Sequence, residues 1–289
     1  MKFWQALSFV ETDQLVEIAR CAEACRFEGV LVSNHLVQPE KIEPAYPYSA
    51  TGDPGFASDT PWPEPFASIA AMATATTRLR FATLVFILPL YDPLEVAKSV
   101  STAAVLSGNR LALGAGAGWM KEEFDIQGVD FRTRGRRFDE QIEVLRKLWS
   151  GEVVEHHGAF FDFPRLRMLP APSRPVPIWI GGISDAALRR AARLGDGWIG
   201  SGQTPAEVEK IATRLHALRR EAGRAAEPFE IIAPLSIPLD ADACRRLEDC
   251  GVSGTVSYPF SYTIGPHSTL ARKRDYLERF ANDVIARFG

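Results

Sequence analysis

An asparagine and a histidine end an apolar stretch that reads "GVLVSNHL" at residues 29–36. The aliphatic residues before them are typical of a strand that is buried on both faces. The imidazole of His35 can donate or accept a proton near neutral pH, whereas the amide of Asn34 offers hydrogen bonds but no proton. The stretch therefore indicates proton transfer at the end of a strand, or a plain turn in which His35 bonds a backbone carbonyl.

Closely spaced glycines mark a second segment, "LGAGAGWM" at residues 113–120. Their spacing is GxGxG rather than the GxGxxG of a dinucleotide-binding turn, and no acid of such a fingerprint follows at the required distance. The glycines indicate a tight loop, or a backbone that approaches a planar ring. In the second interpretation Gly116 and Gly118 lie near the ring, and Trp119 and Met120 add apolar surface.

A third segment, "IWIGGISD" at residues 178–185, joins a predicted strand to a predicted helix. Ser184 or Asp185 can cap that helix, so the backbone amides at its start can point toward a phosphate. The alternative is an ordinary strand-to-helix turn, and the negative charge of Asp185 would oppose a phosphate. The candidate phosphate-binding amides are those of Gly182, Ile183 and Ser184, and Gly181 before them is a further candidate coenzyme contact.

A long proline-rich connection follows the "SNH" stretch and ends near residue 65. A loop of this length inside a compact domain is usually functional or disordered. We expect it to lie over the end of the strand and to supply Tyr46, Tyr48 and Trp62 to a substrate pocket, although the same residues would also serve to pack the loop. Four arginines further along, at positions 132, 134, 136 and 137, indicate contact with an anionic coenzyme tail, or a solvated surface on which one arginine pairs with Asp139 or Glu140.

The elements that must position these residues alternate regularly along the chain. Eight strands interleaved with helices fit a closed (β/α)8 barrel better than an open sheet, and the hairpin pattern at 153–163 is an insertion before the fifth strand. No linker or repeat divides residues 1–289, which predicts one domain. Catalytic groups of such barrels lie at the carboxyl ends of the strands, where Asn34 and His35 fall. Strands are predicted at 2–10, 28–33, 78–88, 109–116, 176–182, 196–200, 229–237 and 251–259, and helices at 12–27, 64–77, 92–108, 136–151, 184–194, 204–223, 240–249 and 268–287.

Composition limits the partners of this chain. Its 289 residues are 46% hydrophobic and 24% charged with a formal net charge of −3, which gives no general attraction to nucleic acid or to an anionic membrane. No stretch has the pattern of a signal peptide or a membrane span, and the four cysteines form neither a disulfide framework nor a metal motif. His156 and His157 read as surface turn residues without further metal ligands. We expect a cytoplasmic homodimer that acts on a small molecule. We expect it to hold no metal.

Four motifs occur together over most of the chain. They are "VSNHL", "LVFILPLYDPLEVAKSVSTAAVLSGNRLALGAGAGWMKEEF", "RGRRFDEQIEVLRKLW" and "PIWIGGISDAALRRAARLGDGWI". In this combination the sequence resembles the bacterial luciferase-like superfamily of flavin and deazaflavin oxidoreductases, in particular the branch that depends on coenzyme F420. The resemblance implies a luciferase-like TIM barrel and an enzyme that uses F420 to exchange a hydride with a small organic substrate.

The resemblance also implies a role for particular residues. In the deazaflavin branch an acidic residue and a histidine at the end of strand two lie against the coenzyme ring; here the pair is Asn34 and His35, so proton transfer depends on His35. A non-prolyl cis peptide is expected at the end of strand three, by position at Leu84–Val85, behind the ring. Two other functions stay open: an FMN-dependent monooxygenase with a separate flavin reductase, and a protein that binds the deazaflavin without turnover.

Overall fold

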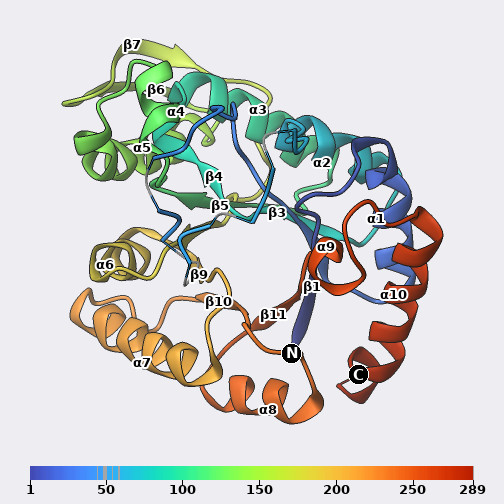
Figure 1. Cartoon of the computed structure of the whole chain (residues 1–289). Coiled ribbons are helices and arrows are strands. Elements are labelled where there is room, and N and C mark those ends of the chain that lie inside the picture. The colour runs from blue at the N-terminus through green and yellow to red at the C-terminus, as the bar shows by residue number, and fades with distance from the viewer. Residues whose placement is uncertain (44, 48–50, 54, 58, 289) are drawn as a thin grey trace.

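Parallel strands form a closed barrel at the centre of the molecule, and helices surround it (Figure 1). The computed structural model describes residues 1–43, 45–47, 51–53, 55–57 and 59–288. The barrel strands carry almost only buried residues, as expected for a sheet covered on both faces. They are β1 (Lys2–Ala6), β2 (Gly29–Val32), β3 (Arg80–Thr83), β4 (Phe86–Ile87), β5 (Leu111–Gly116), β8 (Ile178–Gly181), β9 (Gly197–Ile199), β10 (Glu230–Pro234) and β11 (Gly254–Ser257).

The pairing of the strands closes the sheet. β1 pairs with β2 and β11, and β3 pairs with β2 and β5. β8, β9 and β10 complete the circle between β5 and β11, while β4 continues the path of β3 beside β5. The eight positions around the axis confirm the predicted (β/α)8 barrel, and in this order β1 lies across the barrel from β8.

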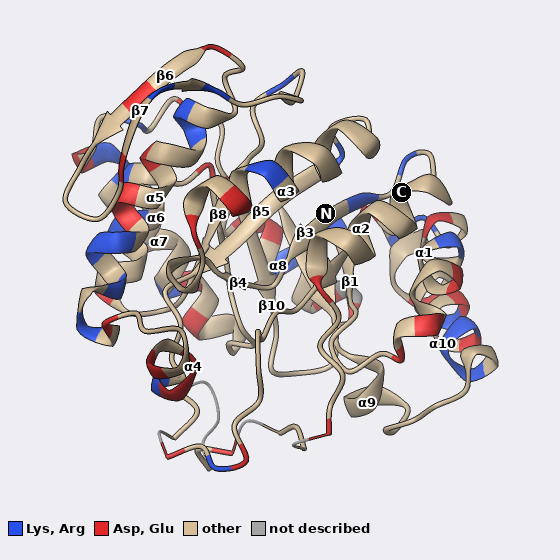
Figure 2. Ribbon diagram, turned by 90° about the horizontal axis from the view of Figure 1, so that it is seen from above, with Lys and Arg blue, Asp and Glu red and all other residues tan. Residues whose placement is uncertain are grey.

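The outer layer follows the helical patterns of the sequence closely. Two short helices, α4 (Lys121–Ile126) and α9 (Phe260–Thr263), were not predicted because neither is long enough to show an apolar stripe. Both lie with the loop after β2 at one end of the molecule, at the bottom of Figure 2. The helices are α1 (Leu15–Ala24), α2 (Pro65–Thr74), α3 (Pro93–Leu106), α4 (Lys121–Ile126), α5 (Arg134–Leu148), α6 (Asp185–Leu194), α7 (Pro205–Glu221), α8 (Ala241–Asp249), α9 (Phe260–Thr263) and α10 (Leu270–Asp283).

The third strand differs from its prediction in one respect. The sequence pattern predicts a continuous strand over 78–88, but the structure breaks it into β3 and β4 at Leu84 and Val85. The peptide bond between these two residues is cis, as the resemblance predicted. The amide of Leu84 still donates to the carbonyl of Val32 at 2.8 Å, so the break lies directly beside the end of β2.

Large aromatic side chains fill the inside of the barrel. Trp4 and Trp179 are fully buried there and meet edge to face with ring centroids 5.3 Å apart. Leu84 and Val85 pack against this inner cluster. Side chains therefore fill the barrel interior on the amino-terminal side of the break in the third strand. The open space begins on the carboxyl-terminal side of the break.

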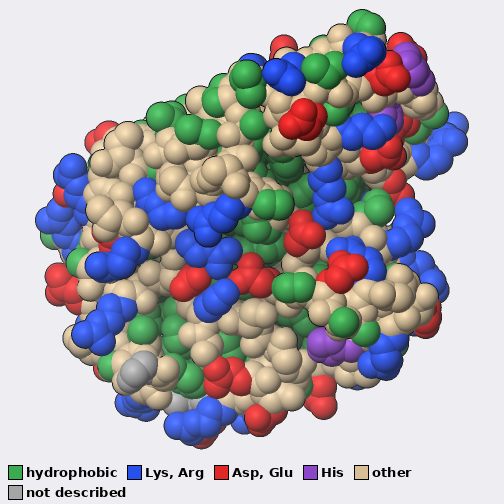
Figure 3. All heavy atoms as spheres, turned by 180° about the vertical axis from the view of Figure 1, so that it is seen from behind, with side chains coloured by type: hydrophobic (Ala, Val, Ile, Leu, Met, Phe, Trp, Pro, Cys, Tyr) green, Lys and Arg blue, Asp and Glu red, His purple; other side chains and the backbone are tan. Residues whose placement is uncertain are grey.

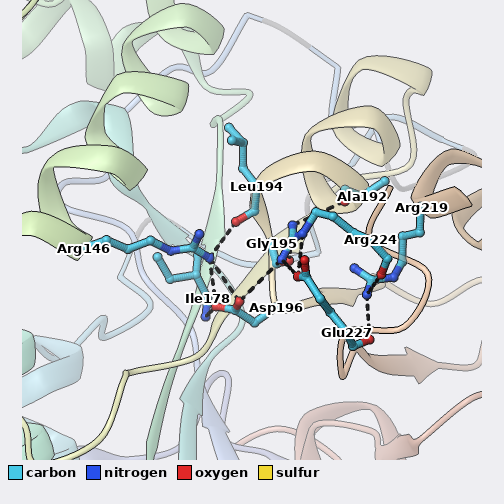
Figure 4. Close-up of polar contacts among 9 residues, drawn as sticks. All are labelled: Arg146, Ile178, Ala192, Leu194, Gly195, Asp196, Arg219, Arg224 and Glu227. Atoms are coloured by element: carbon cyan, nitrogen blue, oxygen red, sulfur yellow. Dashed lines mark hydrogen bonds and ion pairs between the residues drawn. The ribbon is translucent and has the colours of Figure 1, made fainter. Parts of the chain in front are cut away.

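Charged side chains form hydrogen bonds and ion pairs at the opposite end of the barrel, where the strands begin. Figure 3 shows this face, on which basic and acidic side chains are interspersed. Asp196, just before β9, accepts hydrogen bonds from Arg146 at 3.0 Å and from the amide of Ile178 at 2.9 Å (Figure 4). Arg224 donates to the carbonyl of Gly195 at 3.0 Å beside it. These contacts tie α5 and the segment after α7 to the start of two strands, so this end serves stability.

The predicted hairpin is present as β6 (Val153–His157) and β7 (Asp162–Arg167) at the edge of the molecule. The prediction of His156 as a surface residue is wrong, because it is only 5% exposed and its side chain lies against α5. Its Nε2 lies 3.2 Å from Glu140, which also accepts from the amide of Phe161 at 2.9 Å. Among the described residues no group of histidine, cysteine and acidic side chains forms a metal site, and no helix has the length and apolarity to cross a membrane.

Candidate active site

A cavity of about 590 Å³ opens at the carboxyl ends of the strands. Its walls come from the segments that follow β1, β2, β3, β5, β8 and β11, and its floor is the break in the third strand. Most of the residues singled out from the sequence line this one cavity, although they span most of the chain. They are Asn34, His35, Tyr46, Trp62, Leu84, Val85, Gly116, Gly118, Trp119, Gly181, Gly182, Ile183 and Ser184.

One of the predicted residues, Met120, is not part of this wall. Met120 is 1% exposed and precedes α4, where it does not line the cavity. Its side chain is taken up by packing, so its predicted contribution of apolar surface to the cavity is wrong. Tyr48 lies outside the described residues.

The imidazole of His35 is held by a carboxylate. Its Nδ1 lies 3.0 Å from Oε2 of Glu123 on α4, and Oε1 of the same carboxylate accepts the amide hydrogen of Leu36 at 2.8 Å. The Glu123 side chain is almost completely buried, which strengthens both contacts. Because a carboxylate only accepts, Nδ1 carries the hydrogen, and Nε2 is left for the cavity. Within the described part of the chain Nε2 has no hydrogen-bonding partner.

Asn34 joins the end of β2 to the segment after the break. Its Nδ2 donates to the hydroxyl of Tyr91 at 3.0 Å, and its Oδ1 accepts the amide hydrogen of Ile87 at 3.3 Å. Asn34 is 6% exposed, so both ends of its amide are satisfied by protein groups. Burial raises the pKa of Tyr91 to about 12, which keeps its hydroxyl neutral. The amide therefore positions the neighbouring histidine and has no proton of its own to transfer.

The glycines beside the break make room for Val85. A Cβ added at Gly116 would lie 2.7 Å from Val85 Cγ2, and one added at Gly181 would lie 2.8 Å from Val85 Cγ1. The interpretation that Gly116 admits a planar ring therefore needs correction: what Gly116 and Gly181 admit directly is the side chain of Val85, which then faces the cavity. Gly118 has φ +82°, and a Cβ there would meet Ile87 and Phe124 at 2.7 Å.

One side of the cavity is cationic. The Arg134 guanidinium stacks 3.7 Å from the ring centre of Phe131 and donates to the carbonyl of Gly118 at 3.2 Å. No carboxylate among the described residues pairs with Arg134. Burial and the neighbouring charge of Arg190 lower the pKa of Arg134. Two close guanidinium groups at a cavity wall, one of them without a counter-charge, favour an anion there.

The start of α6 lies on the same side. Ser184 caps this helix by accepting the amide hydrogen of Ala187 at 3.3 Å, which settles the choice between Ser184 and Asp185. The Gly182 carbonyl accepts from the Trp198 indole at 2.8 Å, and the amide of Ile183 in the same peptide points the other way. Among the described residues no acceptor takes the amide hydrogens of residues 182–184.

Salt bridges at the start of α6 neutralise the charge of Asp185, which would otherwise repel an anion there. They also show a different pairing of the arginine cluster from the one expected. Asp185 is exposed and pairs with Arg189 at 2.6 Å and with Arg214 at 2.9 Å. These two arginines neutralise its negative charge. Asp139 pairs with Arg190 and Arg193 rather than with the cluster at 132–137.

Aromatic side chains form the other side of the cavity. Phe9, Phe56, Trp62 and Tyr262 pack together with ring centroids 5.2–6.2 Å apart. The His35 ring lies 4.9 Å from Trp62 and 5.4 Å from Phe56, so the imidazole is one edge of this wall. The site residues missed from the sequence include Glu123, Phe9, Tyr262 and Arg190. Glu123 stands in the quoted motif "GWMKEEF", but its spacing does not tell which of two adjacent glutamates turns inward.

A closed parallel barrel with a buried histidine–carboxylate pair facing the cavity at its strand ends is the architecture of a TIM-barrel enzyme. A family model described as luciferase-like monooxygenase matches residues 5–278. The chain therefore belongs to the luciferase-like monooxygenase family and is a luciferase-like oxidoreductase.

The relatives of this chain include uncharacterized proteins and F420-dependent dehydrogenases. An uncharacterized protein of Mycobacterium tuberculosis (strain ATCC 25618 / H37Rv) is 39% identical over 289 residues, 99% of this chain and 100% of that protein. An F420-dependent glucose-6-phosphate dehydrogenase of Nakamurella multipartita is 28% identical over 243 residues, 82% of this chain and 66% of the dehydrogenase.

Solved structures share the fold at low sequence identity. A monooxygenase from Streptomyces bottropensis superposes with a TM-score of 0.78 at 19% identity over the whole of both chains. The coenzyme F420 dependent tetrahydromethanopterin reductase from Methanopyrus kandleri superposes with a TM-score of 0.77 at 15% identity, over 100% of this chain and 99% of the reductase. Both comparisons show the luciferase-like barrel.

Proposed function

We propose that this chain binds coenzyme F420 and exchanges a hydride between it and a small organic substrate. The proposal rests above all on the buried His35–Glu123 pair, because that pair leaves Nε2 of the imidazole facing the cavity. When bound, a deazaflavin supplies or takes up a hydride and reacts poorly with oxygen. What remains for the protein is to orient the reactants, exclude water and move one proton.

His35 is the group that holds or moves this proton. In the neutral ring Nδ1–H donates to Glu123 and Nε2 accepts a proton from the cavity side; in the charged ring Nε2 donates. The carboxylate stabilises the charged ring and fixes its orientation, as a buried acid does for a catalytic imidazole. Asn34 acts on His35 by holding the end of β2.

The residues present fit an anionic coenzyme with a flat ring. Leu84 and Val85 give an apolar floor, while Arg134 and the free amides of 182–184 can hold a phosphate on the far side. We assign to the ring wall Gly118, Trp119 and the side chain of Val85 that Gly116 and Gly181 admit, and we assign to the substrate side Tyr46 and Trp62.

Fluorescence titration of the purified protein tests the coenzyme. We expect F420 to bind in the low micromolar range or tighter, and FMN to bind about tenfold more weakly, a difference of ~1.4 kcal/mol. Arg134→Met should weaken F420 binding, whereas Arg132→Met, at an exposed position of the same cluster, should leave it unchanged.

Tighter binding of FMN would reverse the choice of coenzyme. It would favour a monooxygenase with a separate flavin reductase, and oxygen consumption on addition of reduced FMN would then be measured. Binding of F420 without hydride transfer to any acceptor would favour the non-catalytic alternative. The reason for that alternative is that position 34 holds an asparagine where an acid is expected. Glu123 weakens this reason, because it supplies a carboxylate to His35 from another element.

The proposed partner is a small molecule, and the proposed assembly is a homodimer. Sedimentation velocity at several protein concentrations measures the mass of the assembly directly. A monomer throughout the micromolar range would contradict the dimer and leave the proposed chemistry unaffected.

A further inference from the structure

The cavity has two chemically different sides that face each other across the barrel. Its arginines and the free amides of residues 182–184 come from the segments after β5 and β8. Its aromatic wall comes from the segments after β1, β2 and β11, which are neighbours in the sheet. Because β1 lies across from β8, the aromatic wall lies opposite the cationic side, with the floor at Val85 between them.

The aromatic wall carries no fixed charge. Of the described residues that line the cavity, none is aspartate, glutamate or lysine, and both arginines belong to the opposite side. The hydroxyls of Ser8 and Ser33 bond each other at 2.5 Å. Burial raises the pKa of Tyr258 to about 12, so its hydroxyl is a neutral group.

An ionised substrate would be costly at this wall. A carboxylate, a phosphate or an ammonium group that is moved from water to an apolar surface without a counter-charge loses several kcal/mol of hydration. Flat aromatic faces instead reward apolar rings and chains by burial and by edge-to-face packing. His35, at 4.9 Å from Trp62, is the polar group next to such a substrate.

We infer that the substrate is a neutral, largely apolar organic molecule that packs on Phe9, Phe56, Trp62 and Tyr262 with its reacting group at His35. This inference rests on the proposed function for the reaction that the substrate undergoes. The preference for binding a neutral molecule follows from the aromatic wall alone. Carboxylates and sugar phosphates are excluded from the aromatic wall.

A matched pair of ketones tests this preference in protein without coenzyme. Acetophenone and 4-acetylbenzoate differ by one carboxylate, and glucose 6-phosphate serves as a hydrophilic phosphate; binding is followed by calorimetry and by tryptophan fluorescence. We expect acetophenone to bind at least tenfold more tightly than either anion. Phe56→Ala should weaken acetophenone at least fivefold, while Leu106→Ala, at an exposed position on α3, should change nothing.

Two variants separate the sides of the cavity. Arg134→Met should abolish any residual binding of 4-acetylbenzoate and leave acetophenone unchanged. Tyr262→Arg places a cation on the aromatic wall at a residue that is 57% exposed, and it should raise the affinity for 4-acetylbenzoate at least tenfold.

Three results would overturn the inference. They are equal affinity for both ketones, loss of 4-acetylbenzoate binding in Phe56→Ala, and no binding of acetophenone up to its solubility limit. The coenzyme titration is a separate measurement. A failure to bind F420 would refute the proposed function, whereas the preference for the neutral ketone is decided by the ketone titrations alone.

Discussion

Nδ1 of His35 lies 3.0 Å from Oε2 of Glu123, although 88 positions of the chain separate the two residues. The other carboxylate oxygen accepts the amide hydrogen of Leu36 at 2.8 Å, so one acid fixes both the ring and the backbone beside it. The carboxylate next to the histidine therefore comes from α4, whereas the residue before the histidine at the strand end is the amide Asn34.

Glu123→Gln should lower kcat by roughly 10²-fold or more, with little change in KM. A glutamine has a single acceptor oxygen, so it cannot serve both the imidazole and the Leu36 amide, and its NH₂ group would force the hydrogen of His35 onto Nε2. Imidazole ¹⁵N NMR should report this change of tautomer. Asp125→Asn, at an exposed position of the same helix, is the control and should leave kcat unchanged. An unchanged tautomer together with unchanged kcat would contradict the positioning role.

His35→Ala should lower kcat by roughly 10²–10⁴-fold and leave coenzyme affinity nearly unchanged, because general acid–base catalysis acts in the transition state. Single-turnover kinetics and a coenzyme titration measure the two effects separately. Intact turnover would reduce His35 to a structural residue, whereas a large loss of coenzyme affinity with unchanged kcat would assign it to the coenzyme wall.

Asn34→Ala should lower the free energy of unfolding by about 1–3 kcal/mol, because it leaves the buried amide of Ile87 without its acceptor. Its effect on kcat should be much smaller than that of His35→Ala. Urea unfolding followed by circular dichroism measures the first effect. A loss of kcat as large as that of His35→Ala, at unchanged stability, would show that the amide contacts the reactants.

Gly116→Ala should destabilise the protein by about 1–3 kcal/mol, since its Cβ would lie 2.7 Å from Val85 Cγ2 in a packed site. Combining it with Val85→Ala should recover part of the loss, and thermal unfolding of the single and double variants tests this coupling. Additive losses would mean that the glycine is required for another contact.

Glu230 should make folding stability depend on pH at the amino end of the barrel. Burial opposes its charge, but contacts with Lys2 at 2.5 Å and with Arg80 at 3.3 Å outweigh burial and lower the pKa of Glu230. A lowered folded-state pKa contributes stability above the unfolded value of about 4.3, and this contribution is lost as the pH falls through the folded value. The stability difference between wild type and Glu230→Gln should therefore be largest above about pH 5 and shrink in acid. Glu209→Gln, at an exposed site, should show no such trend; a constant difference for Glu230→Gln would contradict the ion-pair explanation.

Local patterns of the sequence were sufficient for the barrel. Strands such as 29–32 and helices such as 93–106 carry their own periodicity and capping residues, for instance Asp92, which accepts the amide hydrogen of Leu94 at 2.7 Å. The same local reasoning placed His35 at a strand end and Ser184 at a helix start, because both positions depend only on where an element begins or ends.

Tertiary structure decided everything that depends on residues from distant elements meeting. Which of the adjacent residues Glu122 and Glu123 faces His35 depends on the rotation of a six-residue helix too short to show a period. The glycines at 116 and 181 looked like contacts for a ligand, whereas they first make room for Val85, whose position depends on a break inside a predicted strand. Likewise the aromatic wall joins residues from three segments that are neighbours only because the sheet closes. The sequence determined the elements because periodicity and capping act between near neighbours, and closure of the barrel determined the site because it alone sets which loops share one end.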